Sequence, residues 1–217
     1  MNRKQLLLKA FQRGHLLTLK NPLYRSWIEK FIVDETRGDV GEKGDITTHA
    51  IIHSKRLFTA VVRARENWII AGIEEAVFLY NNNRIRVTVF KKDGDKIKKG
   101  GIILKLSGTA KDLLRIERSA LDLLQRMSGI ATLTHNLISS VKGKVAIVPT
   151  RKTQWRYLDK KAVYIGHGLT HRLALWESIL IKDAHLRILE KENGKNSIEA
   201  ALKGAWQHRK NGIFIEI

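Results

Sequence analysis

The sequence predicts an α/β protein of two domains, residues 1–110 and residues 111–217. Short β-rich runs bounded by turn residues occupy the first part, and a long helical pattern opens the second. Brief apolar runs without polar alternation follow that helix, as in the buried strands of parallel sheets. We therefore expect an α+β domain first, and from about residue 145 parallel strands that alternate with helices.

The first 35 residues are expected to be helical, with a break at Asn21 and Pro22. Three glycines between residues 38 and 44 then indicate a loop, after which residues 45–48 either cap a turn or enter a strand. The helical expectation depends on apolar side chains at helical spacing, which are Leu6, Leu7, Ala10, Phe11, Tyr24, Trp27, Ile28 and Phe31.

Two β-rich runs, residues 58–65 and 85–90, predict strands in the first domain, and residues 73–80 between them predict a helix. The run 93–95, Asp-Gly-Asp, is typical of a turn.

Residues 110–142 carry the longest helical pattern, with one apolar face and an expected break at residues 128–129. Four charged residues of this segment lie off the apolar face. Taken singly, each is typical of an ordinary solvated surface; they are Arg115, Arg118, Asp122 and Arg126.

Cationic side chains follow each of three apolar runs that have the composition of buried strands. The runs are residues 146–148, 163–165 and 179–181, and the polar clusters behind them are Thr150, Arg151 and Lys152, then His171 and Arg172, then Lys182 and His185. Parallel sheets gather the residues just beyond their strand ends at one edge. We therefore expect one pocket for a ligand with several negative charges, lined by Arg151, His171, Arg172 and Lys182.

Composition limits the possible classes of protein. The chain has no cysteine, which excludes disulfides and cysteine-based chemistry, and 43% of its 217 residues are hydrophobic, as in ordinary globular proteins. No apolar run approaches the roughly 18 residues of a membrane span, so we expect a cytoplasmic protein without a membrane partner.

The charge balance is strongly basic, with 40 Lys and Arg against 21 Asp and Glu, a formal net charge of +19. Such an excess suits nucleic acid or anionic metabolites, and it also occurs as a plain solvated surface. No nucleic-acid motif accompanies it, so a nucleic-acid partner is disfavoured.

Residues 117–132 resemble the helix signature of the quinolinate phosphoribosyltransferase family (nicotinate-nucleotide pyrophosphorylase, carboxylating). Residues 31–48, 58–78 and 93–95 match that family more loosely. Four later motifs are similar to the family's barrel motifs and keep their order: Thr-Arg-Lys-Thr at 150–153, Gly-His-Gly at 166–168, His-Arg at 171–172 and Ile-Lys-Asp-Ala-His at 181–185. An ordered set is more specific than any single motif.

The resemblance implies a sandwich-like first domain followed by an open α/β barrel, with the site shared across the subunits of a homodimer. It implies catalytic roles for Lys152 and Lys182, and it takes Arg118 into the site of the partner subunit. The substrate-binding residues that it implies are Arg118, Thr150, Arg151, Lys152, His171, Arg172 and Lys182. Of these, Lys152 would face phosphoribosyl pyrophosphate.

The reaction that the resemblance implies is phosphoribosyl transfer from phosphoribosyl pyrophosphate to quinolinate with decarboxylation, giving nicotinate mononucleotide in NAD biosynthesis. Planar guanidinium groups suit the dicarboxylate quinolinate. The departing pyrophosphate would need Mg²⁺, which is commonly held by one or two carboxylates and the substrate phosphates. In this chain the candidate metal ligand is Glu216.

Several features depart from the family pattern. The sequence ends after a helix expected over residues 197–210 and a strand over 213–217, where the family continues with further acidic and glycine-rich segments. We therefore expect a partial barrel, truncated or completed by another chain, with weak quinolinate binding and poor turnover. An altered site is also suggested by Asp122, Pro149, His167 and Ala184.

Two other function classes stay open at this point. One is a non-catalytic family remnant that binds anions or dimerises, and the other is a basic nucleic-acid-binding protein.

Overall fold

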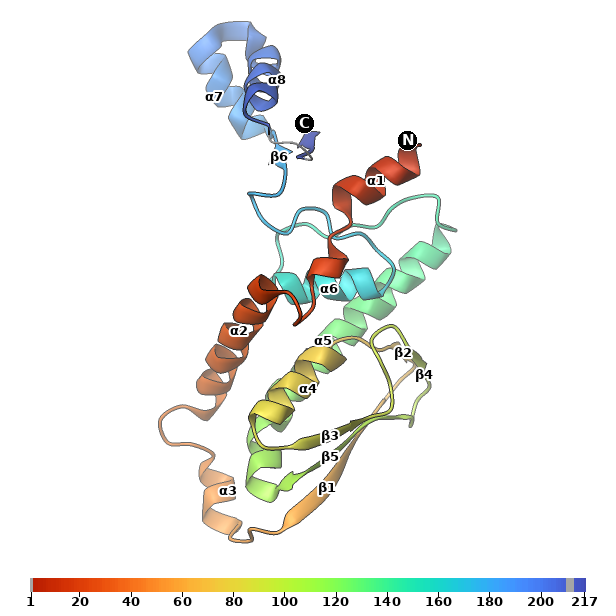
Figure 1. The fold of residues 1–217 in the computed structure, drawn as a ribbon, viewed down its shortest axis with the longest axis vertical. Coiled ribbons are helices and arrows are strands. Elements are labelled where there is room, and N and C mark those ends of the chain that lie inside the picture. The colour runs from red at the N-terminus through yellow and green to blue at the C-terminus, as the bar shows by residue number, and fades with distance from the viewer. Residues whose placement is uncertain (1, 210–212) are drawn as a thin grey trace. The chain divides into compact units, whose positions relative to one another are not determined.

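The computed structural model describes residues 2–209 and 213–217, which form two compact units. The larger unit is Arg13–Thr170, and the smaller unit combines residues up to Gln12 with His171–Ile217. The mixture of helices and strands in both units confirms the α/β fold class (Figure 1). The division into domains at residues 110 and 111 stays a prediction.

A three-stranded antiparallel sheet lies in the larger unit, in the order β1 (Leu57–Arg63), β5 (Ile102–Thr109) and β3 (Arg86–Val89). A separate antiparallel pair consists of β2 (Trp68–Ile69) and β4 (Lys96–Ile97). The strands expected at 58–65 and 85–90 are confirmed with slightly different ends, and the expected turn at 93–95 connects β3 to β4.

Two helices cover the sheet and complete the core of the larger unit. They are α4 (Ile73–Asn82) and α5 (Ala110–Ser140), which contact each other as well as β3 and β5 (Figure 1). Both helices were expected from the sequence. Their apolar faces and the inner face of the sheet are buried together, including Leu79, Leu104, Ile116 and Met127.

The N-terminal helices begin at side-chain caps that the sequence supplies. In α2 (Pro22–Val40), Asn21 accepts a hydrogen bond from Leu23 N, and a proline stands at the first helical position. In α3 (Ile46–Ile51), Asp45 accepts from Thr48 N at 2.9 Å, and these hydrogen bonds lower the pKa of Asp45. Helix α1 (Arg3–Phe11) belongs to the smaller unit, and a short 3₁₀ turn, η1 (Gly14–Leu16), follows it in the larger unit.

One expected break is wrong, and one expected loop begins later than expected. Helix α5 runs without interruption through Ser128 and Gly129, and α2 runs through Gly38, so the expected loop begins only after Val40. Ser128 Oγ accepts from Ala71 N and donates to Ala71 O, so it satisfies the main chain two residues beyond β2 rather than ending its own helix. Gly129 faces Trp68 of β2, where an added Cβ would lie 3.4 Å from the ring.

Two of the three expected strands that precede the cationic clusters are also wrong. Residues 163–165 end helix α6 (Tyr157–Ile165), whose buried Leu158 and Ala162 lie one helical turn apart. Residues 146–148 are not assigned to any strand in the described part of the chain. There Ile147 O accepts a single main-chain bond from Leu169 N, which does not make a ladder.

The smaller unit contains the one parallel pair found in the described residues, β6 (Ile179–Leu180) with β7 (Ile215–Glu216). Between them lie α7 (Asp183–Asn193), a 3₁₀ turn η2 (Gly194–Asn196) and α8 (Ser197–His208). This strand–helix–strand order confirms the strand expected at 179–181 and its parallel partner. The expected helix over 197–210 is confirmed as far as its residues are described, and residue 210 lies outside them.

Candidate functional site

The first cationic cluster lies on an irregular segment between α5 and α6. Thr150, Arg151 and Lys152 are all exposed there, and Lys152 N donates to Thr150 Oγ1 at 3.0 Å. This local bond turns the main chain at the cluster. The segment therefore presents its two cationic side chains to solvent.

Arg126 of α5 ties the end of that segment to the larger unit. Its guanidinium makes two hydrogen bonds to Asp159 of α6, Nε to Oδ1 at 2.7 Å and Nη2 to Oδ2 at 2.9 Å, and these raise the pKa of Arg126. The same group donates to Gln154 Oε1 at 3.3 Å and lies 5.0 Å from the ring centre of Trp155. The sequence assigned Arg126 to a solvated surface. That interpretation is wrong, because its partner stands 33 positions further along the chain, beyond the reach of helical periodicity.

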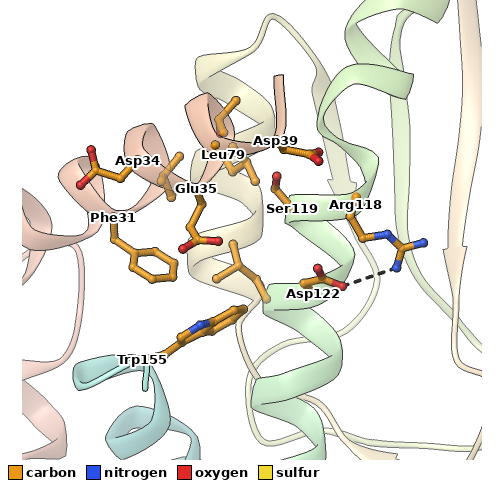
Figure 2. Close-up of a pocket in the computed structure, with 13 residues that line it drawn as sticks. Phe31, Asp34, Glu35, Asp39, Leu79, Arg118, Ser119, Asp122 and Trp155 are labelled. Atoms are coloured by element: carbon orange, nitrogen blue, oxygen red, sulfur yellow. Dashed lines mark hydrogen bonds and ion pairs between the residues drawn. The ribbon is translucent and has the colours of Figure 1, made fainter. Parts of the chain in front are cut away.

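Arg118, which the sequence predicts to be a substrate-binding residue, borders a cavity of about 340 Å³ between α2, α4 and α5. Figure 2 shows Glu35 pointing into this cavity above Trp155, and Arg118 linked to Asp122. The Arg118 Nη1 lies 3.4 Å from Asp122 Oδ1, and both side chains are about half exposed or more. Asp34 and Asp39 also line the cavity, so its charge does not suit a dicarboxylate ligand.

A buried cluster of charges joins α2, α4 and α6. Lys161 Nζ lies 2.5 Å from Glu74 Oε2 and 2.6 Å from Glu75 Oε1, and Tyr24 OH donates to Glu75 Oε1 at 2.7 Å. Burial opposes the charge of Lys161, but Glu75 and its neighbours overcome it and raise the pKa of Lys161. Burial and the negative Glu75 raise the pKa of Tyr24 well above its usual value. The cluster therefore holds a charged lysine and a neutral tyrosine at neutral pH.

Asp93, from the expected turn, extends this cluster to the start of α4. Its Oδ1 accepts from Ile73 N at 2.9 Å, where the cap residue Gly72 has no side chain to offer, and its Oδ2 lies 4.0 Å from Lys161 Nζ. Burial first, and then the charge of Glu75, raise the pKa of Asp93 to about 6. Sequence analysis identified the turn but not this capping role, because the helix that Asp93 caps lies 20 residues earlier.

In the smaller unit, His171 and Glu216 are brought together. His171 Nε2 lies 2.9 Å from Glu216 Oε2, and the His171 ring packs on Phe11 with 5.1 Å between ring centres. Glu216 lies in the short strand β7, so the parallel pair positions it. The carboxylate holds the imidazole in one orientation, as a partner group commonly does for functional histidines.

Arg172 and Lys182 differ sharply in exposure. Arg172 is buried, and its Nη1 donates to Ser178 O at 2.9 Å, which closes the loop that leads into β6. Lys182 is exposed at the start of α7, where its main-chain N donates to His185 Nδ1 at 2.9 Å. The gathering of Arg151, His171, Arg172 and Lys182 around one pocket stays a prediction, since Arg151 belongs to the larger unit and the others to the smaller one.

The described residues contain no preformed cluster of three metal-ligating side chains. Within residues 2–209 and 213–217, no three His, Asp or Glu side chains are placed to hold one ion. Glu216 provides one carboxylate, and His171 already engages it. Mg²⁺ as a cofactor stays a prediction, because one or two carboxylates together with the substrate phosphates are enough to hold this ion. Over the same residues, no helix has both the length and the apolar character that crossing a membrane requires.

Comparison with known proteins connects these motifs to one family. Residues 45–128 match the N-terminal domain of quinolinate phosphoribosyl transferase, and residues 130–217 match its C-terminal domain. A solved structure, the nicotinate-nucleotide pyrophosphorylase from Ehrlichia chaffeensis, is 36% identical, with a TM-score of 0.75, over 87% of this chain and 69% of that one. The chain belongs to the quinolinate phosphoribosyl transferase family.

Other members of the quinolinate phosphoribosyl transferase family show the same likeness. The probable nicotinate-nucleotide pyrophosphorylase (carboxylating) of Methanothermobacter thermautotrophicus is 38% identical over 79% of this chain and 61% of its own length. The NadC structure from Streptococcus pyogenes is 26% identical, with a TM-score of 0.76, over 87% of this chain and 68% of that one. The match to the archaeal relative thus spans about three fifths of that protein.

Proposed function

We propose that the protein to which this chain belongs transfers phosphoribosyl from phosphoribosyl pyrophosphate to quinolinate and releases carbon dioxide, giving nicotinate mononucleotide. The observation that carries the proposal is the match to both domains of the family, which together cover residues 45–128 and 130–217. The reaction makes the protein a pentosyltransferase of NAD biosynthesis.

In this proposal, different cationic side chains bind the two substrates. Arg151, His171 and Arg172 bind the two carboxylates of quinolinate, because guanidinium groups match a dicarboxylate in charge and an imidazole N–H can donate a hydrogen bond to it. Lys152, beside Thr150 in the exposed segment, faces phosphoribosyl pyrophosphate. Lys182 contacts quinolinate where the ring carboxylate is lost.

Positioning and electrostatics account for the catalysis that we propose. Pyrophosphate leaves C1 of the ribose through a transition state with oxocarbenium character, so the enzyme chiefly aligns two anions and stabilises the leaving group. In this proposal Mg²⁺ enters the site bound to the pyrophosphate group of phosphoribosyl pyrophosphate. Glu216 as a ligand of that ion stays a prediction.

A homodimer completes the proposal, with Arg118 extending into the site of the partner subunit. Its support is the exposure of the Arg118 side chain, 63% exposed on the surface of α5. A cytoplasmic location and the lack of a nucleic-acid partner are retained as expectations. Cell fractionation tests the first, and a gel shift measured at several salt concentrations tests the second.

The experiment is a turnover assay of the purified protein with quinolinate and phosphoribosyl pyrophosphate, with and without Mg²⁺. We expect release of nicotinate mononucleotide and carbon dioxide, and a loss of at least about a hundredfold in kcat/KM for Arg151→Ala, since a bidentate partner of a substrate carboxylate is removed. Quinolinate binding without turnover would instead favour a family member that has kept recognition and lost catalysis. A protein that shows no binding of quinolinate and no turnover would contradict the proposal.

A further inference from the structure

Lys160 of α6 is a lysine whose charged end lies inside the protein. The residue is only 2% exposed, and its Nζ donates a hydrogen bond to the main-chain oxygen of Thr170 at 2.8 Å. Lysine is seldom buried this fully unless its ammonium is paired, because an uncompensated charge is costly in the interior. One partner here is the carbonyl of Thr170, the last one before His171.

Thr170 ends a loop that is held tightly against α6. Gly168 N donates to Val163 O and Leu169 N donates to Ile147 O, both at 2.9 Å. A Cβ on Gly168 would lie 2.5 Å from Val163 Cγ1, so the loop backbone and the helix are in direct contact. The loop therefore has little freedom before it reaches Thr170.

The backbone around Thr170 adopts conformations that side chains rarely allow. His167 has a φ of +71° and His171 a φ of +54°, both in the left-handed region. Non-glycine residues keep such angles only where the surrounding structure imposes them, and they concentrate at functional sites. Thr170 is held on its side chain as well, because Arg13 N donates to Thr170 Oγ1 at 2.7 Å.

We propose that Lys160 is a positioning residue for His171 and Arg172. Its ammonium binds the carbonyl of Thr170, the last residue of the larger unit, which is bonded directly to His171. A hydrogen bond from a charged donor is stronger than a neutral one, and the low dielectric of the interior strengthens it further. The role in quinolinate binding rests on the proposed function, whereas the contact itself does not.

The test compares Lys160→Met with Leu158→Ala. Methionine keeps the length of the side chain and removes the ammonium. Leu158 is fully buried on the same helix and has an apolar side chain, so its truncation lowers stability without touching Thr170. Two quantities are measured on each folded variant: amide hydrogen exchange over residues 167–172, and the Kd for quinolinate.

We expect Lys160→Met to speed exchange over residues 167–172 by about tenfold or more relative to Leu158→Ala, and to raise the quinolinate Kd by a similar factor, as the loss of a charged hydrogen bond implies. Equal exchange in the two variants would overturn the proposal. If the unaltered protein does not bind quinolinate, the proposed function fails, and the exchange data still decide the role of Lys160. Should Lys160→Met not fold, Lys160→Gln is measured in its place against the same criterion.

Discussion

At the level of single residues, two arginines of α5 form ion pairs of very different value. Arg126 makes two hydrogen bonds to Asp159, whose side chain is 7% exposed, whereas Arg118 and Asp122 are 63% and 47% exposed. Solvent and salt screen the second pair, and side-chain entropy opposes it. The Arg126 pair provides the hydrogen bonds that the buried carboxylate of Asp159 needs, so the stability of the protein depends on the geometry of this pair.

The same substitution at both arginines tests this difference. Arg126→Lys should lower the free energy of unfolding by about 1–3 kcal/mol, because a lysine cannot reproduce the paired hydrogen bonds to Asp159. Arg118→Lys should change it by less than about 0.5 kcal/mol. Urea denaturation of both variants measures the two values. Equal losses would mean that burial of Asp159 does not govern the pair.

Asp93 should make the stability of the larger unit depend on pH. Its pKa is raised to about 6 in the folded protein from an ordinary value of 3.8, so the folded state binds the proton more tightly than the unfolded state does. The contribution of Asp93 to the free energy of unfolding is therefore fully present below pH 3.8, its ordinary pKa, and is lost as the pH rises through about 6. Asparagine mimics the protonated side chain and keeps the oxygen that accepts from Ile73 N.

Asp93→Asn should accordingly gain stability relative to the unaltered protein as the pH increases. The difference in unfolding free energy should grow by about 2 kcal/mol between pH 4 and pH 7, which is most of the energy equivalent of the pKa shift. Denaturant titrations at pH 4, 5, 6 and 7 measure it. Asp95→Asn, which removes the same charge from the same turn, serves as the reference. A difference from the unaltered protein that does not vary with pH would contradict the role assigned to Asp93.

At the level of elements, the contact between α5 and α6 requires a glycine. A Cβ on Gly166, which ends α6, would lie 2.4 Å from Ala131 O and 2.8 Å from Thr134 Cβ, both in α5. Its φ is −73°, so the constraint is steric and not conformational. By contrast, Gly38 lies within α2, and a Cβ there meets nothing within 4 Å.

Alanine at these two glycines should therefore have opposite effects. Gly166→Ala should lower the free energy of unfolding by about 2–3 kcal/mol, since the two helices must separate. Gly38→Ala should raise it by up to about 1 kcal/mol through helix propensity. Thermal or urea unfolding gives both signs, and a stabilising Gly166→Ala would show that the two helices have room to adjust.

Helices α2, α4 and α5 and strands β1 and β3 of the larger unit were predicted, because each is recorded in local periodicity and turn residues. Strands β2, β4 and β5 and helix α3 were not predicted. Helix α6 was not predicted either. Its run 163–165 is apolar and β-branched at two of its three positions, but the helix depends on contacts that local sequence does not reveal, such as those of Lys160 with Thr170 and Lys161 with Glu75. Two consecutive lysines suggest a surface, whereas here both are buried against partners.

At the level of the whole molecule, the order of the motifs predicted the family more securely than it predicted the geometry of the site. The family is confirmed over residues 45–128 and 130–217. The expectation that three strand ends present the cations is wrong for two of them, because only residues 179–180 of the expected runs form a strand. Residue types and their order survive such differences, whereas side-chain placement depends on long-range packing.

The proposal that the site is shared between subunits makes a prediction about mixed dimers. If each site takes Arg118 from one subunit and Arg151 from the other, Arg118→Ala and Arg151→Ala homodimers should both be nearly inactive. A mixed dimer has one site that lacks both arginines and one site that keeps both. Random exchange of equal amounts should therefore restore about a quarter of the unaltered activity, since half of the dimers are mixed and each holds one intact site of two.

The measurement is the turnover assay before and after the two variants are unfolded together and refolded. The double variant Arg118→Ala/Arg151→Ala, refolded with the unaltered protein, is the control. In it each site of a mixed dimer lacks one arginine, so exchange should halve the activity of the mixture, from about half to about a quarter of that of the unaltered protein. Activity that does not recover in the first mixture, although mixed dimers are present, would mean that Arg118 acts within its own subunit or not at all.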